Sequence, residues 1–200
     1  GSSSYIDIII DYYSTHFTDQ FIADFDISSD KVVFYNNSES SVTNSFQAEV
    51  NSKFINGLEA KISYNFLNAT YNKNGVSQEL PFYAKHKAML SVTFETENKD
   101  WLFNINSQYF GKQKLPSTSS NPVEYQRGDY SDPFVMINNQ VTFKTGFYEF
   151  YTGIENLLNY KQENPIISAN NPFGRYFDTS FNWGPTKGRE FYFGFRFKLN

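Results

Sequence analysis

Apolar side chains recur at every second position along most of the chain, which is the period of a β-strand, whereas helical spacing is almost absent. The last segment shows the pattern most clearly, because polar residues, tyrosine and glycine alternate there with Phe191, Phe193, Phe195, Phe197 and Leu199. Similar apolar rows occupy residues 6–12, 46–50, 58–66, 88–94, 101–105, 135–143 and 150–154. The sequence therefore predicts an all-β chain of about eight antiparallel strands, most of them long enough to cross a bilayer at a tilt, which takes roughly 9 to 11 residues.

The connections between these strands alternate between short and long. Tight hairpin turns are predicted at Asn56-Gly57, at residues 97–100 and at Thr145-Gly146, and an Asn-Gly pair favours a type I′ turn. Residues 18–40, 72–82, 115–132 and 158–187 are rich in Asn, Ser, Asp, Gly and Pro, as mobile loops are. This asymmetry is typical of up-and-down transmembrane β-barrels of the outer membrane, with both chain ends and the short turns on the periplasmic side.

Charge and composition exclude several classes of protein. The net charge of -4 is spread over the chain without a basic stripe, so nucleic acid is not an expected partner. The absence of Cys removes thiol catalysis, thiolate metal sites and disulfides. The longest apolar run, Ile8-Ile9-Ile10, is far shorter than the roughly 20 residues of a membrane-spanning helix, which excludes a helical membrane protein.

No residue pattern indicates catalysis, a metal site or a cofactor. His16 and His86 are far apart in the sequence, and two histidines without cysteine do not build a three-histidine site. Residues 24–30 alternate oxygen-bearing side chains like the start of a calcium loop, but Ser29 and Tyr35 stand where such a loop has its glycine and its closing glutamate. We therefore expect a protein that is not an enzyme and has no cofactor.

The polar rows of the strands contain mainly Asn, Ser, Thr and Gln and few of the Lys and Glu residues that usually cover a soluble sheet. This composition is typical of a barrel lumen, with the apolar rows facing lipid. Aromatic residues near the strand ends would then form two interfacial girdles. The short-turn girdle comprises Phe54, Trp101, Phe143 and Phe147, and the long-loop girdle comprises Tyr71, Phe82, Tyr109 and Phe134.

Two other architectures fit the same alternation. A soluble β-sandwich would pack its apolar rows face to face, and its aromatic side chains could serve as stacking platforms of a β-rich carbohydrate-binding module. A complete eight-stranded outer-membrane barrel would close its first strand against its last, because the strand number is even and both ends lie on one side. Burial of the apolar rows between two sheets would support the first alternative, and a signal peptide directly before Tyr5 would support the second.

The terminal strand has a further feature. A polar residue, a glycine and two hydrophobic residues separated by one position resemble the assembly signal of outer-membrane barrels, and these places are taken by Tyr192, Gly194, Phe197 and Leu199. The position of this pattern at the end of the chain makes it more specific than the pattern alone. In lipid the strand must also pair along its free edge, because unpaired backbone groups there each cost several kcal/mol.

Several segments resemble TonB-dependent outer-membrane receptors, especially those of the Bacteroides group. The clearest motif is Gly153-Ile154-Glu155-Asn156-Leu157-Leu158-Asn159-Tyr160-Lys161-Gln162, followed by residues 164–167, 171–174, 176–178 and 183–189. Shorter segments with the same resemblance are residues 33–38, 80–82, 85–87 and 109–113. The resemblance implies the last eight or so strands of a 22-stranded barrel that imports a metal chelate such as a siderophore, haem or cobalamin.

The resemblance also implies an organisation and a set of partners. Residues 5–200 would form the carboxyl-terminal barrel segment, and residues 1–4 would be a cloning scar or a cut point. The expected partners are outer-membrane lipid, the plug domain of the same receptor and, through that plug, TonB, with a surface lipoprotein as a further candidate. The 200 residues contain neither a plug nor a TonB-contacting segment, so we expect a fragment or a receptor with parts in another chain.

Aromatic and arginine side chains on the long loops are the candidate ligand contacts, because they can stack on a small-molecule chelate and pair with its charges. They are Tyr125, Arg127, Arg175, Tyr176 and Phe177. On the polar rows, Arg189, Arg196 and Lys198 can attract an anionic chelate or simply face water in the lumen.

Overall fold

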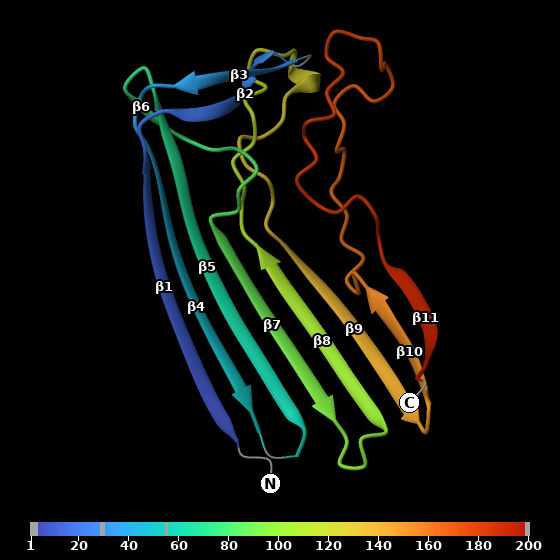
Figure 1. Ribbon diagram of the computed structural model, residues 1–200. Coiled ribbons are helices and arrows are strands. Elements are labelled where there is room, and N and C mark those ends of the chain that lie inside the picture. The colour runs from blue at the N-terminus through green and yellow to red at the C-terminus, as the bar shows by residue number, and fades with distance from the viewer. Residues whose placement is uncertain (1–3, 29–30, 55, 199–200) are drawn as a thin grey trace.

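The computed structural model describes residues 4–28, 31–54 and 56–198. Its main feature is one antiparallel sheet whose eight long strands follow one another in chain order (Figure 1). These strands are β1 (Tyr5–Phe17), β4 (Ser41–Lys53), β5 (Leu58–Lys73), β7 (His86–Glu95), β8 (Trp101–Phe110), β9 (Phe134–Thr145), β10 (Tyr148–Glu155) and β11 (Glu190–Phe197). The prediction of an all-β chain of up-and-down antiparallel strands is confirmed. Among the described residues, no helix has the length and apolarity needed to cross a membrane.

The strand register places all the apolar rows on the same face of the sheet. Ile62 of β5 pairs with Val50 of β4 on one side and with Leu90 of β7 on the other. The same holds further along the sheet, where Phe143 of β9 lies between Trp101 and Phe150. Because side chains alternate in direction along a strand, this register makes one continuous apolar surface, called here the outer face.

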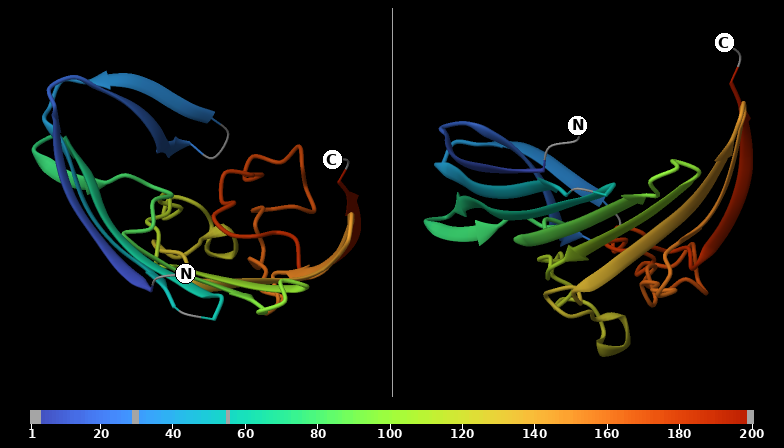
Figure 2. Two further views of the ribbon diagram at one scale, coloured as in Figure 1. Left: turned by 60° about the horizontal axis from the view of Figure 1, so that its bottom comes forward. Right: turned by 90° about the horizontal axis from the view of Figure 1, so that it is seen from below.

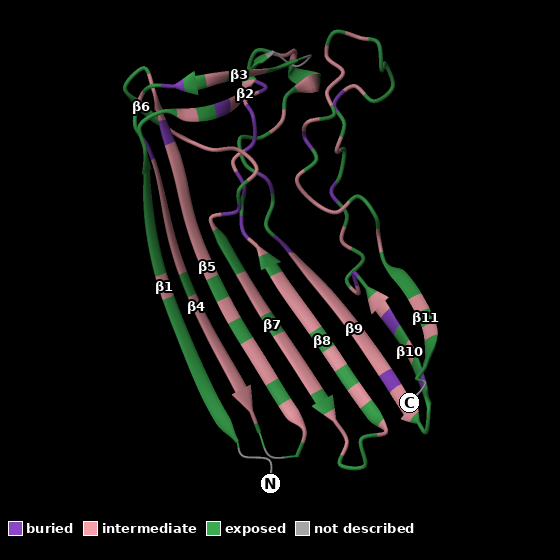
Figure 3. Cartoon of the chain, viewed as in Figure 1, coloured by how far each residue is buried: buried purple, intermediate pink, exposed green. Residues whose placement is uncertain are grey.

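The outer face is not covered by a second layer in the part of the chain that the structure describes. Phe193 of β11 is 89% exposed, and many other large apolar side chains of this face are also exposed. Exposed positions recur along the long strands (Figure 3). A β-sandwich buries such rows between two sheets. The soluble sandwich interpretation is therefore not supported by the fold.

The sheet is curved, and the long loops lie on its concave side (Figure 2). Phe134, whose side chain points away from the outer face, stacks there on Tyr160 and contacts Trp183 of the loops. The polar rows therefore line the concave side, which is called here the inner face. Within the described residues, β1 pairs only with β4 and β11 only with β10, so the sheet is open at both edges and does not close into an eight-stranded barrel.

The three tight turns predicted from the sequence, at Asn56-Gly57, residues 97–100 and Thr145-Gly146, all lie at one end of the sheet (Figure 1). Asn56 and Gly57 both have positive φ, 80° and 78°, which is the backbone of a type I′ hairpin. Tyr5 pairs with Lys53 at this end, and Phe197 pairs with Tyr148 beside the turn at Thr145-Gly146. The first and last described strands thus begin and end on the same side of the sheet as the short turns.

The long connections at the other end contain more regular structure than the sequence predicted. Residues 18–40 form a separate hairpin of β2 (Gln20–Ser28) and β3 (Lys31–Asn37), and residues 72–82 contain β6 (Val76–Glu79), which pairs with the end of β5. The β5–β6 turn has positive φ at Asn74 and Gly75, so this second Asn-Gly pair is a hairpin signal that the sequence analysis missed. Residues 115–132 contain the short 3-10 helix η1 (Val123–Tyr125).

The two Asn-Gly turns differ in what surrounds their glycine. A Cβ atom on Gly57 would lie 2.0 Å from the carbonyl oxygen of Glu95, whereas one on Gly75 would meet no atom within 4 Å. We expect Gly75→Ala to cost about 1 kcal/mol through its positive φ alone, and Gly57→Ala to cost clearly more. Denaturant unfolding of the two variants measures the difference. Equal losses would contradict the close packing of this turn against β7.

Candidate functional site

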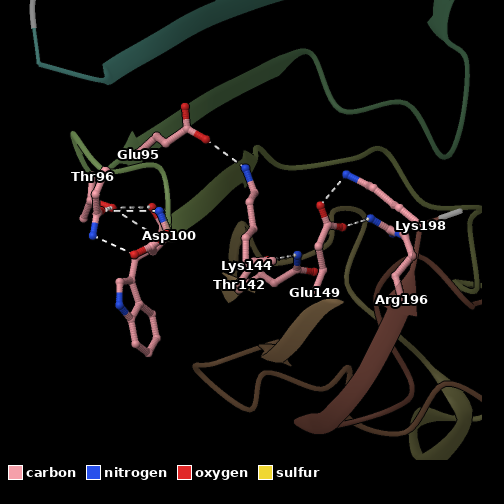
Figure 4. Close-up of polar contacts among 11 residues, drawn as sticks. Glu95, Thr96, Asp100, Thr142, Lys144, Glu149, Arg196 and Lys198 are labelled. Carbon is pink, nitrogen blue, oxygen red and sulfur yellow. Dashed lines mark hydrogen bonds and ion pairs between the residues drawn. The ribbon is translucent and has the colours of Figure 1, made fainter. Parts of the chain in front are cut away.

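The inner face is polar and carries ion pairs between residues of different strands. Lys144 of β9 lies 2.8 Å from Glu95 of β7 (Figure 4). The carboxylate of Glu149 is buried and accepts hydrogen bonds from both Arg196 and Lys198, whose side chains remain exposed (Figure 4). This wall therefore presents water-facing cations around a buried carboxylate at its short-turn end.

At the opposite end, the long loops pack into a layer with a small hydrophobic core of its own. Leu115, Ile167 and Phe181 are buried at its centre, and Phe82, Tyr125 and Trp183 pack around them. These side chains come from three different connections. The layer therefore depends on contacts between segments that are far apart in the sequence.

Two buried amides hold residues 156–187 in this layer. Asn156 donates to the carbonyl oxygens of Tyr160 and Lys187, at 2.7 and 3.1 Å, and its Oδ1 accepts from the Tyr160 N–H at 2.9 Å. Gln162 Oε1 accepts from the N–H groups of Trp183 and Gly184, both at 2.8 Å. Both amides lie in the motif that carries the family resemblance, but the sequence did not show what they bind.

The β2–β3 hairpin is tied to the wall and to the loops by carboxylates. Asp24 is 3% exposed and lies 2.6 Å from the ammonium group of Lys73 at the end of β5. Asp26 accepts a hydrogen bond of 2.6 Å from the Ser117 N–H in the next long loop. Both residues fall in the segment that resembles the start of a calcium loop, and in the structure they make these structural contacts. Among the described residues, no group of three or more His, Cys, Asp or Glu could hold a metal ion.

Three of the predicted ligand-contact residues come together in the loop layer. The rings of Tyr125 and Tyr176, from different loops, stack with centroids 5.1 Å apart. The guanidinium group of Arg175 lies over the Tyr176 ring at 5.8 Å. Arg127 makes other contacts: its backbone N–H donates to the hydroxyl of Thr118, at 2.7 Å, and its guanidinium donates to the carbonyl oxygen of Gln126.

Phe177, the fifth predicted contact, lines a hollow of about 440 Å³ between the β2–β3 hairpin and residues 172–180. Phe25, Lys31 and Asp178 also line the hollow, and so does Phe173, which is 99% exposed. The sequence analysis did not single out Phe25, Lys31 or Phe173. Pro172 and Gly174 on either side of Phe173 are the turn signal that could have placed this ring at a loop tip.

The aromatic girdles are placed only in part as predicted. At the short-turn end, Trp101 and Phe143 lie on the outer face with ring centroids 4.7 Å apart. Phe147 contacts the ring of Phe197 at the neighbouring turn, and Phe54 is exposed where β4 ends. At the long-loop end, Tyr109 lies on the outer face and is 41% exposed.

The other three long-loop residues do not belong to an outward-facing girdle. Tyr71 and Phe134 are 6% and 7% exposed, and both have the alternation of the inner face. Phe82 packs against the hydrophobic core of the loop layer. Tyr71 and Phe134 lie on the inner face because residues an odd number apart along a strand point to opposite faces.

Burial in the loop layer also raises the pKa of the Tyr160 hydroxyl, and the ring of Tyr160 stacks on Phe134.

The residues of the proposed assembly signal are divided between the two faces. Phe197 lies on the outer face, and Tyr192 lies on the inner face, where its hydroxyl donates to Gln140 at 2.9 Å. Gly194 lies against the ring of Tyr151, where a Cβ atom would come within 2.4 Å of the hydroxyl oxygen. Leu199 lies outside the described residues. Recognition of these residues by an assembly machinery stays a prediction.

No protein-family model and no curated protein matches the chain. Solved structures do match. The ferric-catecholate import receptor Fiu of Escherichia coli K12 aligns with 95% of this chain at a TM-score of 0.66 and 12% sequence identity, and the FrpB iron transporter of Neisseria meningitidis (F3-3 variant) aligns with 95% at 0.58 and 12%. The chain covers 25% and 28% of these proteins. At this identity the likeness concerns the fold alone: the antiparallel sheet of this chain is arranged like part of these two larger proteins.

Proposed function

We propose that the chain forms the carboxyl-terminal part of the barrel wall of a TonB-dependent outer-membrane receptor, together with the external loops that capture an iron chelate. The single observation that supports this most is the division of the sheet into two faces. One face carries the apolar rows of all eight long strands, with exposed large apolar side chains on β1, β5, β7, β8, β10 and β11, and the other is polar and curves around loops. This is the division that a membrane barrel requires.

Contact with lipid explains why the outer face remains uncovered. Removing one large apolar side chain from water is worth about 1.5–3 kcal/mol, and the outer face exposes such side chains on β1, β5, β7, β8, β10 and β11. An exposed apolar surface of this extent on a soluble protein would mark an interaction site or cause aggregation. A bilayer covers the whole face at once, without any specific partner.

The open edges of the sheet favour a wall segment over a complete small barrel. Backbone groups left unpaired in hydrocarbon cost several kcal/mol each, so β1 and β11 need strands beside them. Residues from elsewhere in the receptor would supply these strands, in line with the 25% and 28% coverage of the two matching structures. The plug domain and, through it, TonB would then act on the inner face, and a surface lipoprotein remains a candidate partner of the loops. The affiliation with receptors of the Bacteroides group rests on the sequence segments alone.

The loop layer supports a chelate as the substrate. Tyr125, Tyr176 and Arg175 offer stacked rings and a cation at its surface, which suit a planar, anionic ligand. The matching structures are named for ferric-catecholate import and iron transport. A siderophore is therefore our preferred substrate class, with haem and cobalamin as the alternatives, and we propose no enzymatic activity.

Replacing one ring of the stacked pair should weaken chelate capture. Because aromatic stacking and cation–π contacts together contribute about 1.4 kcal/mol, we expect Tyr176→Ala to weaken binding of a ferric catecholate about 10-fold. Tyr176→Phe keeps the ring and should bind like the unaltered receptor. Uptake of radioactive iron by iron-starved cells that produce the full-length receptor measures the effect, with cells lacking TonB as the control.

The uptake experiment can also contradict the proposal. Iron uptake that persists without TonB would argue against a TonB-dependent receptor. Uptake of haem or cobalamin but of no ferric siderophore would leave the receptor assignment and change the substrate class. Equal iron uptake through the Tyr176→Ala and Tyr176→Phe receptors would show that the stacked Tyr125–Tyr176 pair does not take part in chelate capture.

A further inference from the structure

Two sequence motifs that the proposed function does not use lie side by side at the long-loop end of the sheet. Residues 85–87 begin β7, and residues 109–113 end β8, which pairs with it. The Gly111 N–H donates to the carbonyl oxygen of His86 at 2.8 Å, and a Cβ atom on Gly111 would lie only 2.9 Å from that oxygen. Glycine at this position therefore allows the two motifs to meet, and together they line a pocket of about 450 Å³.

The pocket opens on the outer face, at the upper border of the apolar surface. His86 pairs with Phe66, and Tyr109 pairs with Val135, both in outer-face rows. The His86 ring also shares a hydrogen bond of 2.7 Å with the hydroxyl of Tyr64, which belongs to the same face. An occupant of this pocket would therefore touch polar groups above and the apolar surface below.

The charges at the pocket favour an anion. Glu79, the carboxylate in the lining, is held by Lys85 and also accepts from the Tyr130 hydroxyl. Lys112 is exposed in the lining, and among the described residues no carboxylate lies within ion-pairing distance of it. Tyr109 adds a hydroxyl group on the apolar side. The pocket thus combines an uncompensated cation with hydrogen-bond donors.

We propose that this pocket binds the phosphate-bearing head group of a lipid of the outer leaflet, with the acyl chains lying along the outer face of β7, β8 and β9. The inference rests on the proposed placement of the outer face in the membrane. Basic pockets at the border of the hydrocarbon region are suited to anionic head groups, and aromatic residues commonly occupy the same level. The continuity of the pocket with the apolar surface favours a lipid over a free anion.

Lys112→Gln tests the proposal in the purified full-length receptor. Native mass spectrometry in a nonionic detergent measures how much dioleoylphosphatidylglycerol gives half-occupancy of tightly bound lipid. Loss of one lysine near a head group should raise that amount about 5-fold. The matched control is Lys87→Gln. Lys87 is close in sequence to Lys85, which lines the pocket, but its side chain lies on the inner face over the ring of Phe110. The control should bind the lipid as the unaltered receptor does.

His86→Gln changes a second residue of the pocket and should weaken lipid binding as Lys112→Gln does. Three results would overturn the proposal. Equal lipid binding by the Lys112→Gln and Lys87→Gln variants would show that the lipid does not bind in this pocket. Displacement of the lipid by an equal concentration of inorganic phosphate would show a free-anion site instead. Equal binding of dioleoylglycerol, which lacks the phosphate, would show that apolar contact alone retains lipid. If the lipid test fails but the outer face is still shown to lie in lipid, only the head-group pocket is disproved and the proposed function stands.

Discussion

Phe193→Arg is expected to destabilise the membrane-inserted receptor by about 2–4 kcal/mol, the cost of an arginine facing lipid near the bilayer midplane. Phe193 is 89% exposed in the middle of the outer row of β11. If this face met water, replacing so exposed a side chain would change the stability by less than about 0.5 kcal/mol. The size of the effect therefore separates a membrane wall from a soluble sheet.

The measurement is guanidinium unfolding of the full-length receptor folded into phosphatidylcholine vesicles. Phe173→Arg is the matched control, because Phe173 is 99% exposed on a long loop that the proposal places in water. We expect this control to leave the unfolding midpoint almost unchanged. Equal stability of both variants and the unaltered protein would contradict the placement of the outer face in lipid.

Asn156→Ala is expected to loosen the loop layer by about 3 kcal/mol. The substitution removes three hydrogen bonds of the amide and leaves two backbone groups of Tyr160 and the carbonyl of Lys187 without partners, at about 1 kcal/mol each. Asn156 also has a positive φ of 52°, which Asn adopts more readily than Ala. Because the amide is only 3% exposed, water cannot easily replace its contacts.

Hydrogen exchange of the full-length receptor measures this loosening directly. Amides in residues 156–188 should exchange about 100-fold faster in the variant, while those of β7 and β8 should be unchanged. Asn156→Gly retains the positive φ but not the hydrogen bonds, and should show most of the effect. Asn170→Ala, at an exposed position of the same loop, should show none. Unchanged exchange in Asn156→Ala would mean that the loop layer is held mainly by its apolar core.

The sheet could be predicted from the sequence because its pattern is local. The rows around Ile62, Leu90 and Phe193 alternate within single strands, and pairing of consecutive strands is sufficient to align them on one face. The Asn56-Gly57 turn could be predicted for the same reason, since a type I′ hairpin needs positive φ at two adjacent residues.

The long-loop girdle was not predicted correctly, because the alternation of side chains was not followed to the end of β5. Tyr71 is seven residues from Tyr64, so the two rings point to opposite faces, and β5 extends far enough for this to matter. Phe82 could not be placed by alternation at all. It lies in a loop, and its position is decided by packing against side chains of other loops.

By itself, the sequence determined the strand character of the chain, the separation of an apolar face from a polar one, and the end at which the long loops lie. These properties follow from the direction that each side chain takes along its own strand and from turn residues that act locally. Only the tertiary structure decided that Tyr125 stacks on Tyr176, that Asp24 pairs with Lys73, and that the sheet formed by the described residues remains open at β1 and β11. Loops have no period from which a partner can be predicted, and such contacts form only after the wall has brought distant segments together.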